Sequence, residues 1–256
     1  MRKNKLKDMI AAQDPIVCGW LSIPSAYLAE GAGHQGYDCV AVDLQHGMLG
    51  FEFAVHMLQA ISSTPAVPIV RSPSNEPEGI MHLLDAGAYG VVCPMVSNKE
   101  DAAALVSACR YAPVGTRSFG PARGKLYGGA DYFQHANEEI LVIPMIETAE
   151  GLSNIDDILS VTGVDMIYIG PNDLALALGE APGAENGPSK TSEAISHILH
   201  RATVAGVPVG IFCSSPQMAR QRIAEGFAMV TPGNDFALAT QGMSDAVRHS
   251  RAADAG

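Results

Sequence analysis

Eight short apolar segments recur along the chain, each followed by a longer stretch with helical spacing, and this rhythm constrains the fold more than any other feature. Most are apolar throughout rather than alternating, which is typical of strands covered on both faces of a parallel sheet. Eight strand–helix units in 256 residues predict an α/β fold, a single (β/α)8 TIM barrel spanning residues 1–256. An open doubly wound sheet is the alternative. The predicted strands are IVCGWLSI (16–23), YDCVAVDL (37–44), AVPIVR (66–71), YGVVCPMV (89–96), ILVIPMIE (140–147), VDMIYIG (164–170), VPVGIFC (207–213) and FAMVTP (227–232).

Two connections between these units are longer than the usual few residues. The segment 112–137 is rich in Gly, Arg and Tyr and carries Arg117 and Arg123. We expect it to fold over the catalytic face or to reach a neighbouring subunit. The segment 178–190 is rich in Pro and Gly and is predicted to be an exposed linker.

Composition narrows the class of partner. Lys and Arg number 16 against 27 Asp and Glu, a formal charge of −11, which argues against a nucleic-acid partner and favours a small molecule. The cationic start MRKNKLKDMIAAQ lacks the apolar stretch of a secretory signal, and no apolar run approaches the length that spans a bilayer. Five widely spaced cysteines without a Cys-x-x-Cys pair are read as reduced thiols, so a cytoplasmic protein without a membrane partner is expected.

Polar residues follow the predicted strands, where TIM barrels build their sites. Glu147 ends the fifth strand and Asp173 follows the sixth. Two hard carboxylates from neighbouring strand ends, completed by water and substrate oxygens, suit Mg²⁺ or Mn²⁺. The alternative is that each carboxylate caps the helix that begins beside it.

Two further polar residues at strand ends are candidates for the chemistry. His46 lies just past the second strand, where an imidazole is able to move a proton near neutral pH, although an isolated loop histidine is more often only exposed. Arg71 ends an apolar strand, where it would meet either a substrate anion or a structural partner such as Asp43 or Asp85.

Other features limit the mechanism. Trp20 and Phe212 close the first and seventh strands and are candidates for the wall of an acceptor pocket, with core packing as the alternative. No lysine stands at a strand end, as a Schiff-base mechanism would need, and no glycine-rich phosphate loop is present. The absence of such a lysine favours a metal.

Taken together, these motifs resemble the HpcH/HpaI family of metal-dependent class II pyruvate aldolases, which includes 4-hydroxy-2-oxoheptanedioate aldolase and 2-keto-3-deoxy sugar acid aldolases. The similarity covers almost the whole chain, and the order and spacing of the motifs make it specific. The matching pieces are VDLQHG, PIVRSPSNEP, LLDAGAYGVVCPMV, CRYAPVGTR, IPMIETAEGL, GVDMIYIGPNDLALALG and GIFC.

The resemblance implies a role for each candidate residue. Glu147 and Asp173 would hold a divalent ion, Mg²⁺, Mn²⁺ or Co²⁺, that chelates a pyruvate-like donor. Arg71 would neutralise the keto oxygen as it becomes an enolate, and His46 would be the base. The stretch Gly170 to Asp173 would meet the donor carboxylate through the backbone of Asn172. Trp20, Phe212 and the segment with Arg123 would select the acceptor.

One implied role conflicts with the predicted topology. The family pairs the histidine with an aspartate that matches Asp85, yet Asp85 precedes the fourth strand and so belongs near the opposite rim from His46. Either a neighbouring subunit or an unusual helix end brings the two together, or Asp43 takes the role in this chain.

Two substitutions depart from the family pattern. Gln45 stands where many members have a Glu, and Met145 stands where they have a Gln. Gln45 is able to hydrogen-bond a metal-bound water but cannot take its proton, and Met145 removes a polar contact. We therefore expect these two substitutions to affect metal affinity and the preference between donors more than other properties.

The expected activity is reversible retro-aldol cleavage of a 4-hydroxy-2-oxo acid to pyruvate, or hydroxypyruvate, and an aldehyde. The resemblance also implies a homo-oligomer, a hexamer built as a trimer of dimers, with an exchanged or packed C-terminal helix. A citrate-lyase-like enzyme acting on acyl-CoA thioesters is the enzymatic alternative. A silent metabolite-binding barrel is the other, and only Gln45 and Met145 favour it.

Overall fold

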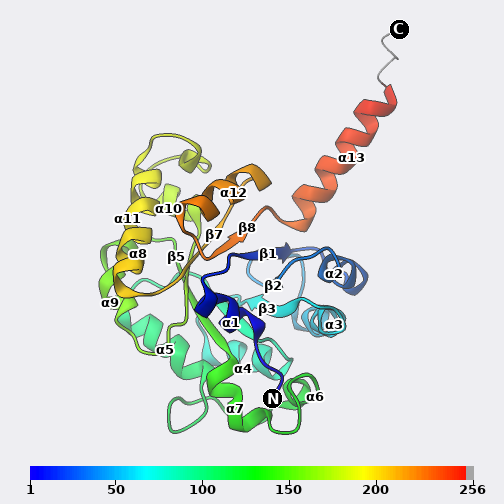
Figure 1. Cartoon of the computed structure of the whole chain (residues 1–256), viewed down its shortest axis with the longest axis vertical. Coiled ribbons are helices and arrows are strands. Elements are labelled where there is room, and N and C mark those ends of the chain that lie inside the picture. The colour runs from blue at the N-terminus through cyan, green and yellow to red at the C-terminus, as the bar shows by residue number, and fades with distance from the viewer. Residues whose placement is uncertain (252–256) are drawn as a thin grey trace.

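The computed structural model describes residues 1–251, which form a closed barrel of eight parallel strands (Figure 1). Strand β1 pairs with β8 through Ile16 and Met229, so the sheet closes on itself and the open-sheet alternative is excluded. The strands are β1 (Ile16–Leu21), β2 (Cys39–Asp43), β3 (Val67–Arg71), β4 (Gly90–Cys93), β5 (Leu141–Ile146), β6 (Ile167–Ile169), β7 (Val209–Phe212) and β8 (Met229–Thr231).

Helices cover the outside of the barrel, as the spacing of apolar residues predicts. Helix α3, for example, buries Met57, Leu58 and Ile61 on one face, while every residue of β2 beneath it is also buried. Burial on both faces explains why the strands are apolar throughout. The covering helices are α2 (Ala26–Gly33), α3 (Phe51–Ser62), α4 (Pro77–Asp85), α5 (Lys99–Cys109), α8 (Ala149–Ser153), α9 (Ile155–Leu159), α10 (Pro171–Ala177), α11 (Lys190–Ala205) and α12 (Pro216–Glu225).

An additional helix, α1 (Lys5–Ala12), lies at the end of the barrel where the strands begin. Its N-cap residue Asn4 is buried and donates from its side chain to the carbonyls of Tyr89 and Glu139, which precede β4 and β5. The Asn4 side chain also accepts a hydrogen bond from the amide of Leu6, a fully buried residue. This end of the barrel is therefore closed by a bonded N-terminal segment.

The long segment 112–137 lies at the same end, so the expectation that it covers the catalytic face is wrong for this chain. It contributes α6 (Ala122–Gly128) and the start of α7 (Tyr132–Glu139), which lie beside the N-terminus in Figure 1. The backbone amide of Arg2 donates to the carbonyl of Gly128 and fixes that position. The second long connection contains a short 3-10 helix, η1 (Ala184–Asn186).

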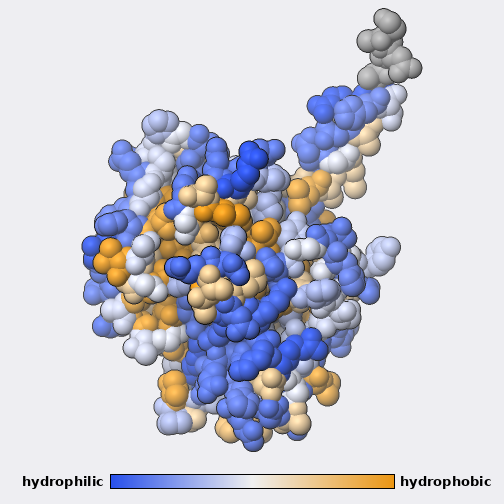
Figure 2. All heavy atoms as spheres, viewed as in Figure 1, coloured by the Kyte–Doolittle hydropathy of each residue, from blue (hydrophilic) through white to orange (hydrophobic). Residues whose placement is uncertain are grey.

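The last helix, α13 (Asp235–Arg251), projects away from the barrel rather than packing on it (Figure 1). Asp235 is its buried residue, whereas Phe236, Met243 and Val247 are exposed. Figure 2 shows apolar residues along one side of this helix and hydrophilic residues along the other. The expected packed position of this helix is therefore not found within one chain. No helix among residues 1–251 has the length and hydropathy needed to cross a membrane.

We predict that Asn4→Ala lowers the free energy of unfolding by about 2 kcal/mol, because it removes two buried side-chain hydrogen bonds, to the carbonyls of Tyr89 and Glu139, and a helix cap. Denaturant titration measures this. The matched control is Gln35→Ala, since exposed Gln35 also bonds a carbonyl, that of Gly31, and should cost less than about 0.5 kcal/mol. Equal losses in the two variants would contradict the role given to Asn4.

Candidate active site

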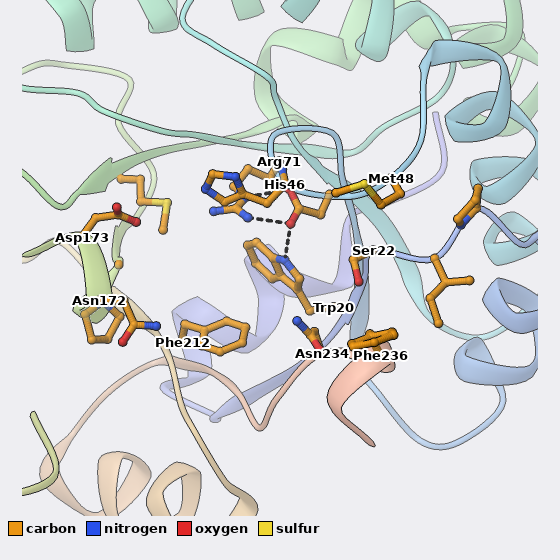
Figure 3. A pocket seen from close by; sticks show the side chains of 16 residues that line it. Trp20, Ser22, His46, Met48, Arg71, Asn172, Asp173, Phe212, Asn234 and Phe236 are labelled. Atoms are coloured by element: carbon orange, nitrogen blue, oxygen red, sulfur yellow. Dashed lines mark hydrogen bonds and ion pairs between the residues drawn. The ribbon is translucent and has the colours of Figure 1, made fainter. Parts of the chain in front are cut away.

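A pocket of about 550 Å³ opens at the carboxyl ends of the strands (Figure 3). Its lining includes Trp20, His46, Arg71, Asp173 and Phe212, five residues that the sequence singled out. Gly170 and Asn172 line it as well. The whole lining comes from seven of the eight strands or the segments that follow them, all but β4.

Asp43 organises one side of this pocket. Its carboxylate accepts from Nε and Nη2 of Arg71 and from Nε1 of Trp20 (Figure 3). It also accepts from the backbone amides of Gln45 and His46, which shapes the loop after β2. Burial alone would raise the pKa of Asp43, but its bonds to Arg71 outweigh burial and hold that pKa below the ordinary value. Asp43 is therefore a charged hub.

Arg71 is the structural partner of Asp43 and still faces the pocket. Its guanidinium carbon lies 5.1 Å from the centre of the Trp20 ring, a cation–π contact. The ion pair uses Nε and Nη2, while Nη1 has no partner in the described chain. Arg71 is therefore able to fill both of the roles considered for it, structural partner and ligand of a substrate anion. Asp43 fixes the plane of the guanidinium, and Nη1 remains free to donate.

Glu147 lies directly after β5 with its carboxylate buried. Its Oε1 accepts from the backbone amide of Met95 at 2.8 Å, whereas its Oε2 has no partner among the described residues. Burial first, and then the charge of Asp173, raise the pKa of Glu147 to about 7. Met95 has a φ of 60°, an uncommon conformation for a residue with a side chain, and this strain aims its amide at Glu147.

The capping alternative for the two carboxylates is not supported. Thr148, not Glu147, caps α8 by accepting from the amide of Gly151 at 2.9 Å. The N-cap residue of helix α10 is Gly170, and no side chain caps this helix. Asp173 lies in its first turn and is exposed. Both carboxylates are left available for a ligand.

These residues fit a divalent cation. A buried carboxylate oxygen without a donor, next to a second carboxylate, is the arrangement that a cation would stabilise. No group of three or more His, Cys, Asp or Glu side chains in residues 1–251 is placed to hold a metal. Two protein carboxylates leave the remaining positions to water and substrate, as is typical of Mg²⁺ sites.

Gly170 has to be a glycine because its backbone approaches Glu147 closely. A Cβ at this position would lie 2.3 Å from Glu147 Oε2 and 2.7 Å from Cε of Met145. Both distances are below van der Waals contact, so any side chain here would displace the carboxylate. Met145 therefore packs against the same backbone as the carboxylate and lines the pocket.

The opposite wall is aromatic. Trp20 stacks on Tyr168 with ring centres 5.5 Å apart and meets Phe212 edge-on at 5.9 Å. Trp20 is almost wholly buried, so it packs in the core and also lines the pocket. Phe236 and Met48 extend this wall, and sequence reasoning missed both because they follow strand ends without a polar or motif signal.

Three predicted site residues do not line the pocket of this chain. Glu147 lies directly against Gly170, which does line it, whereas Asp85 and Arg123 lie elsewhere. Asp85 ends α4 and forms an ion pair with Arg117 at 2.8 Å, so one chain does not bring it to His46. Arg123 donates to the carbonyls of Ala86 and Leu58 at the ends of α4 and α3. Cations are favoured at helix C-termini, which explains why Arg123 lies there rather than over the acceptor pocket.

Comparison with known proteins agrees with this geometry. The family model described as HpcH/HpaI aldolase/citrate lyase matches residues 17–241. The chain belongs to this family. It is 43% identical to the hydroxypyruvate/pyruvate aldolase of Rhizorhabdus wittichii, over 97% of this chain and 99% of that protein. It is 35% identical to the 5-keto-4-deoxy-D-glucarate aldolase of Escherichia coli (strain K12 / DH10B), over 94% of this chain and 96% of that protein.

A solved structure shows the same barrel. A family protein from Burkholderia cenocepacia J2315 superposes with a TM-score of 0.92 at 32% identity, covering 98% of this chain and all of that one. The chain is accordingly an enzyme, an aldolase of the HpcH/HpaI family. Gln45 stands where many members of the family have a Glu. Its side-chain oxygen is buried without a partner in the described chain, and its backbone amide donates to Asp43.

Asp235 is a residue of this site that sequence reasoning did not identify. Its carboxylate accepts from the backbone amides of Ser22 and Ile23 and from the hydroxyl of Ser22, at 2.8 to 3.0 Å. The carbonyl of Ser22 in turn accepts from the amide of Met48. Asp235 therefore ties the first turn of α13 to two loops that line the pocket.

We predict that Asp235→Ala frees the β1–α2 loop, because three partly buried donors lose their acceptor. Hydrogen–deuterium exchange at the amides of Ser22 and Ile23 should accelerate at least roughly tenfold, which corresponds to about 1.4 kcal/mol or more of lost local stability. The matched control is Asp245→Ala, on the exposed part of the same helix, which should leave both amides protected. Unchanged exchange in Asp235→Ala would contradict the clamp.

Proposed function

We propose that this aldolase reversibly cleaves a 4-hydroxy-2-oxo acid into pyruvate, or hydroxypyruvate, and an aldehyde, with the help of a divalent cation. The observation that carries the proposal is the buried Oε2 of Glu147, which has no partner among the described residues and lies against Gly170. Gly170 lines the pocket together with Asp173 and the fixed guanidinium of Arg71. The names of the two aldolases described above support the same reaction class.

Glu147 and Asp173 would hold the cation. When bound, Mg²⁺, Mn²⁺ or Co²⁺ supplies a Lewis acid for the keto and carboxylate oxygens of the donor, and hard oxygen ligands admit all three ions. Gly170 keeps the Glu147 carboxylate in place by close backbone contact, and Met95 holds its other oxygen. The orientation of this carboxylate is thus determined before any ligand binds.

Arg71 would stabilise negative charge on the keto oxygen as the donor becomes an enolate. Its two bonds to Asp43 prevent the guanidinium from turning, and Nη1 is the donor left over. A preorganised donor aimed at developing charge contributes more to the transition state than to the ground state. The backbone around Asn172 would meet the donor carboxylate.

His46 would be the base that removes a proton from C3 of the donor and returns it. Its ring is exposed to the pocket, while its backbone amide is held by Asp43. Asp43 contacts only the backbone of His46 and so does not pair with the ring. We further propose that Asp85 is the partner of the ring and reaches His46 from a neighbouring subunit.

Proton NMR of pyruvate in D₂O tests the donor chemistry without any aldehyde. With metal-stripped protein the methyl signal should persist, and added Mn²⁺ at trace level or Mg²⁺ should cause its loss by deuterium exchange. Glu147→Gln and Asp173→Asn should each lower the exchange rate at least roughly a hundredfold, because each removes a charged ligand. Their circular dichroism should match that of the wild type.

Absence of exchange with either metal would sink the proposal for pyruvate. Exchange with hydroxypyruvate alone would change the donor, and binding of acetyl-CoA with a thermal shift would favour a citrate-lyase-like activity. Binding of pyruvate without exchange would favour a metabolite-binding barrel.

We also propose that the chain forms a homo-oligomer, a hexamer arranged as a trimer of dimers, in which α13 is exchanged between subunits. The projecting helix carries exposed Phe236, Met243 and Val247 at spacings that place them on one side. Such a stripe on a helix that leaves its own barrel is best covered by a second copy of the chain.

We predict that the double variant Met243→Glu, Val247→Glu lowers the mass measured by sedimentation velocity to that of a smaller assembly, because it places charge in the stripe. The matched control is Gln241→Glu on the other side of the helix, which should keep the wild-type mass. A wild-type protein that sediments as a monomer would rule out the exchanged helix.

A further inference from the structure

We infer that the acceptor aldehyde of this enzyme is uncharged and carries hydroxyl groups, rather than a second carboxylate. The inference rests on the proposed function and specifies the substrate class of the same pocket. It follows from how charge is divided between the two sides of that pocket.

The ionisable side chains that line the pocket gather on the donor side. They are Asp43, His46, Arg71 and Asp173, which follow β2, β3 and β6. Figure 3 shows Asp173 on one side and Met48 and Phe236 on the other, with Trp20 between them. The loops after β1, β7 and β8 contribute no charged side chain to the lining within residues 1–251.

The acceptor side is apolar with a few neutral polar groups. The apolar surface comes from Ile23, Pro24, Met48, Phe212 and Phe236, together with one face of Trp20. A carboxylate placed against this wall would lose water without gaining a cation, which is unfavourable.

Two neutral amide side chains supply donors instead: Asn234 beside Phe236 on the acceptor side, and Asn172 beside Asp173 on the donor side (Figure 3). The oxygen of Asn234 accepts from the backbone amide of Ala237, and the oxygen of Asn172 accepts from that of Gly183. Each side chain therefore keeps its NH₂ group free, and Figure 3 shows both nitrogens on the pocket side. Such donors match hydroxyl oxygens on a short sugar-like aldehyde.

The two arginines of segment 112–137, the segment expected to select the acceptor, are already bonded elsewhere. Arg117 pairs with Asp85 and also donates to the hydroxyl of Tyr132. Arg123 donates to two main-chain carbonyls and to the hydroxyl of Ser62. Neither guanidinium is available to neutralise an acceptor carboxylate in the described chain.

The chemistry at the acceptor does not itself require a charge. In the direction of synthesis, C3 of the donor loses a proton to the base and forms a carbon–carbon bond to the aldehyde carbon. The π-electron pair of the aldehyde moves to its oxygen, which takes up one proton. The selection between aldehydes is therefore made by the groups that contact the rest of the acceptor molecule.

The test compares pairs of aldehydes that differ in one group. With the metal-loaded enzyme and saturating pyruvate, kcat/KM is measured for glycolaldehyde against glyoxylate and for glyceraldehyde against tartronate semialdehyde. We expect the hydroxyl member of each pair to be favoured at least roughly tenfold, because the carboxylate lacks a partner. Equal rates, or a preference for the carboxylate members, would overturn the inference.

The two aldehydes of a pair also differ in their intrinsic reactivity. That difference is the same for the wild type and for a variant, so comparing the ratio of kcat/KM values between the two proteins cancels it. Met48→Arg places a cation at the acceptor side, at a residue that is 82% exposed and tolerant of a long side chain. The preference for hydroxyl members should shrink at least roughly tenfold. Met48→Gln, without charge, and Tyr27→Arg, at an equally exposed residue outside the pocket lining, should keep the wild-type ratio.

Pyruvate methyl exchange in D₂O, measured on the same samples without an aldehyde, separates the two ideas. Exchange together with a carboxylate preference would overturn the acceptor class and leave the donor chemistry standing. Loss of exchange in the wild type would overturn the proposed function, and the acceptor class with it. A Met48→Arg ratio equal to that of Tyr27→Arg would show that Met48 does not face the acceptor.

Discussion

The ion pair between Asp43 and Arg71 is the interaction on which the rest of the site depends. The two residues are direct partners in the pairing of β2 with β3, so the register of the barrel places them side by side. Both are almost fully buried, and a buried charge is stable only with its partner. The same carboxylate then accepts from Trp20 and from the backbone of the His46 loop, so one ion pair fixes Arg71, the loop of His46 and the aromatic wall.

The sequence was sufficient to predict the barrel and the residues at strand ends, because both follow from local pattern. Continuous apolar strands indicate burial on two faces, and polar residues directly after them can only meet at one end of the barrel. Glu147, Asp173, His46 and Arg71 are predicted in this way, and the last three line the pocket. Their contacts cannot be predicted so, because the orientation of the Glu147 carboxylate depends on the bond between its Oε1 and the amide of Met95, 52 residues away in the chain.

The remaining residues were missed or misplaced for reasons that act over long distances. Asp235 reaches Ser22 only because β8 closes against β1, and nothing near Asp235 in the sequence signals that contact. Arg123 attracted a substrate role because a loop arginine suggests an anion. In the folded chain, the carbonyls at the ends of α3 and α4 satisfy it at the opposite end of the barrel.

The first turn of α13 connects the pocket to the surface on which subunits are proposed to meet. Asn234 and Phe236 line the acceptor side, Asp235 clamps the β1–α2 loop, and the same helix then leaves the barrel with an exposed apolar stripe. If a second subunit covers that stripe, assembly also restrains the acceptor wall. The donor side does not share this dependence, because Asp43, Arg71 and Glu147 are held by contacts within the barrel. Acceptor selection is therefore the property that assembly would alter first.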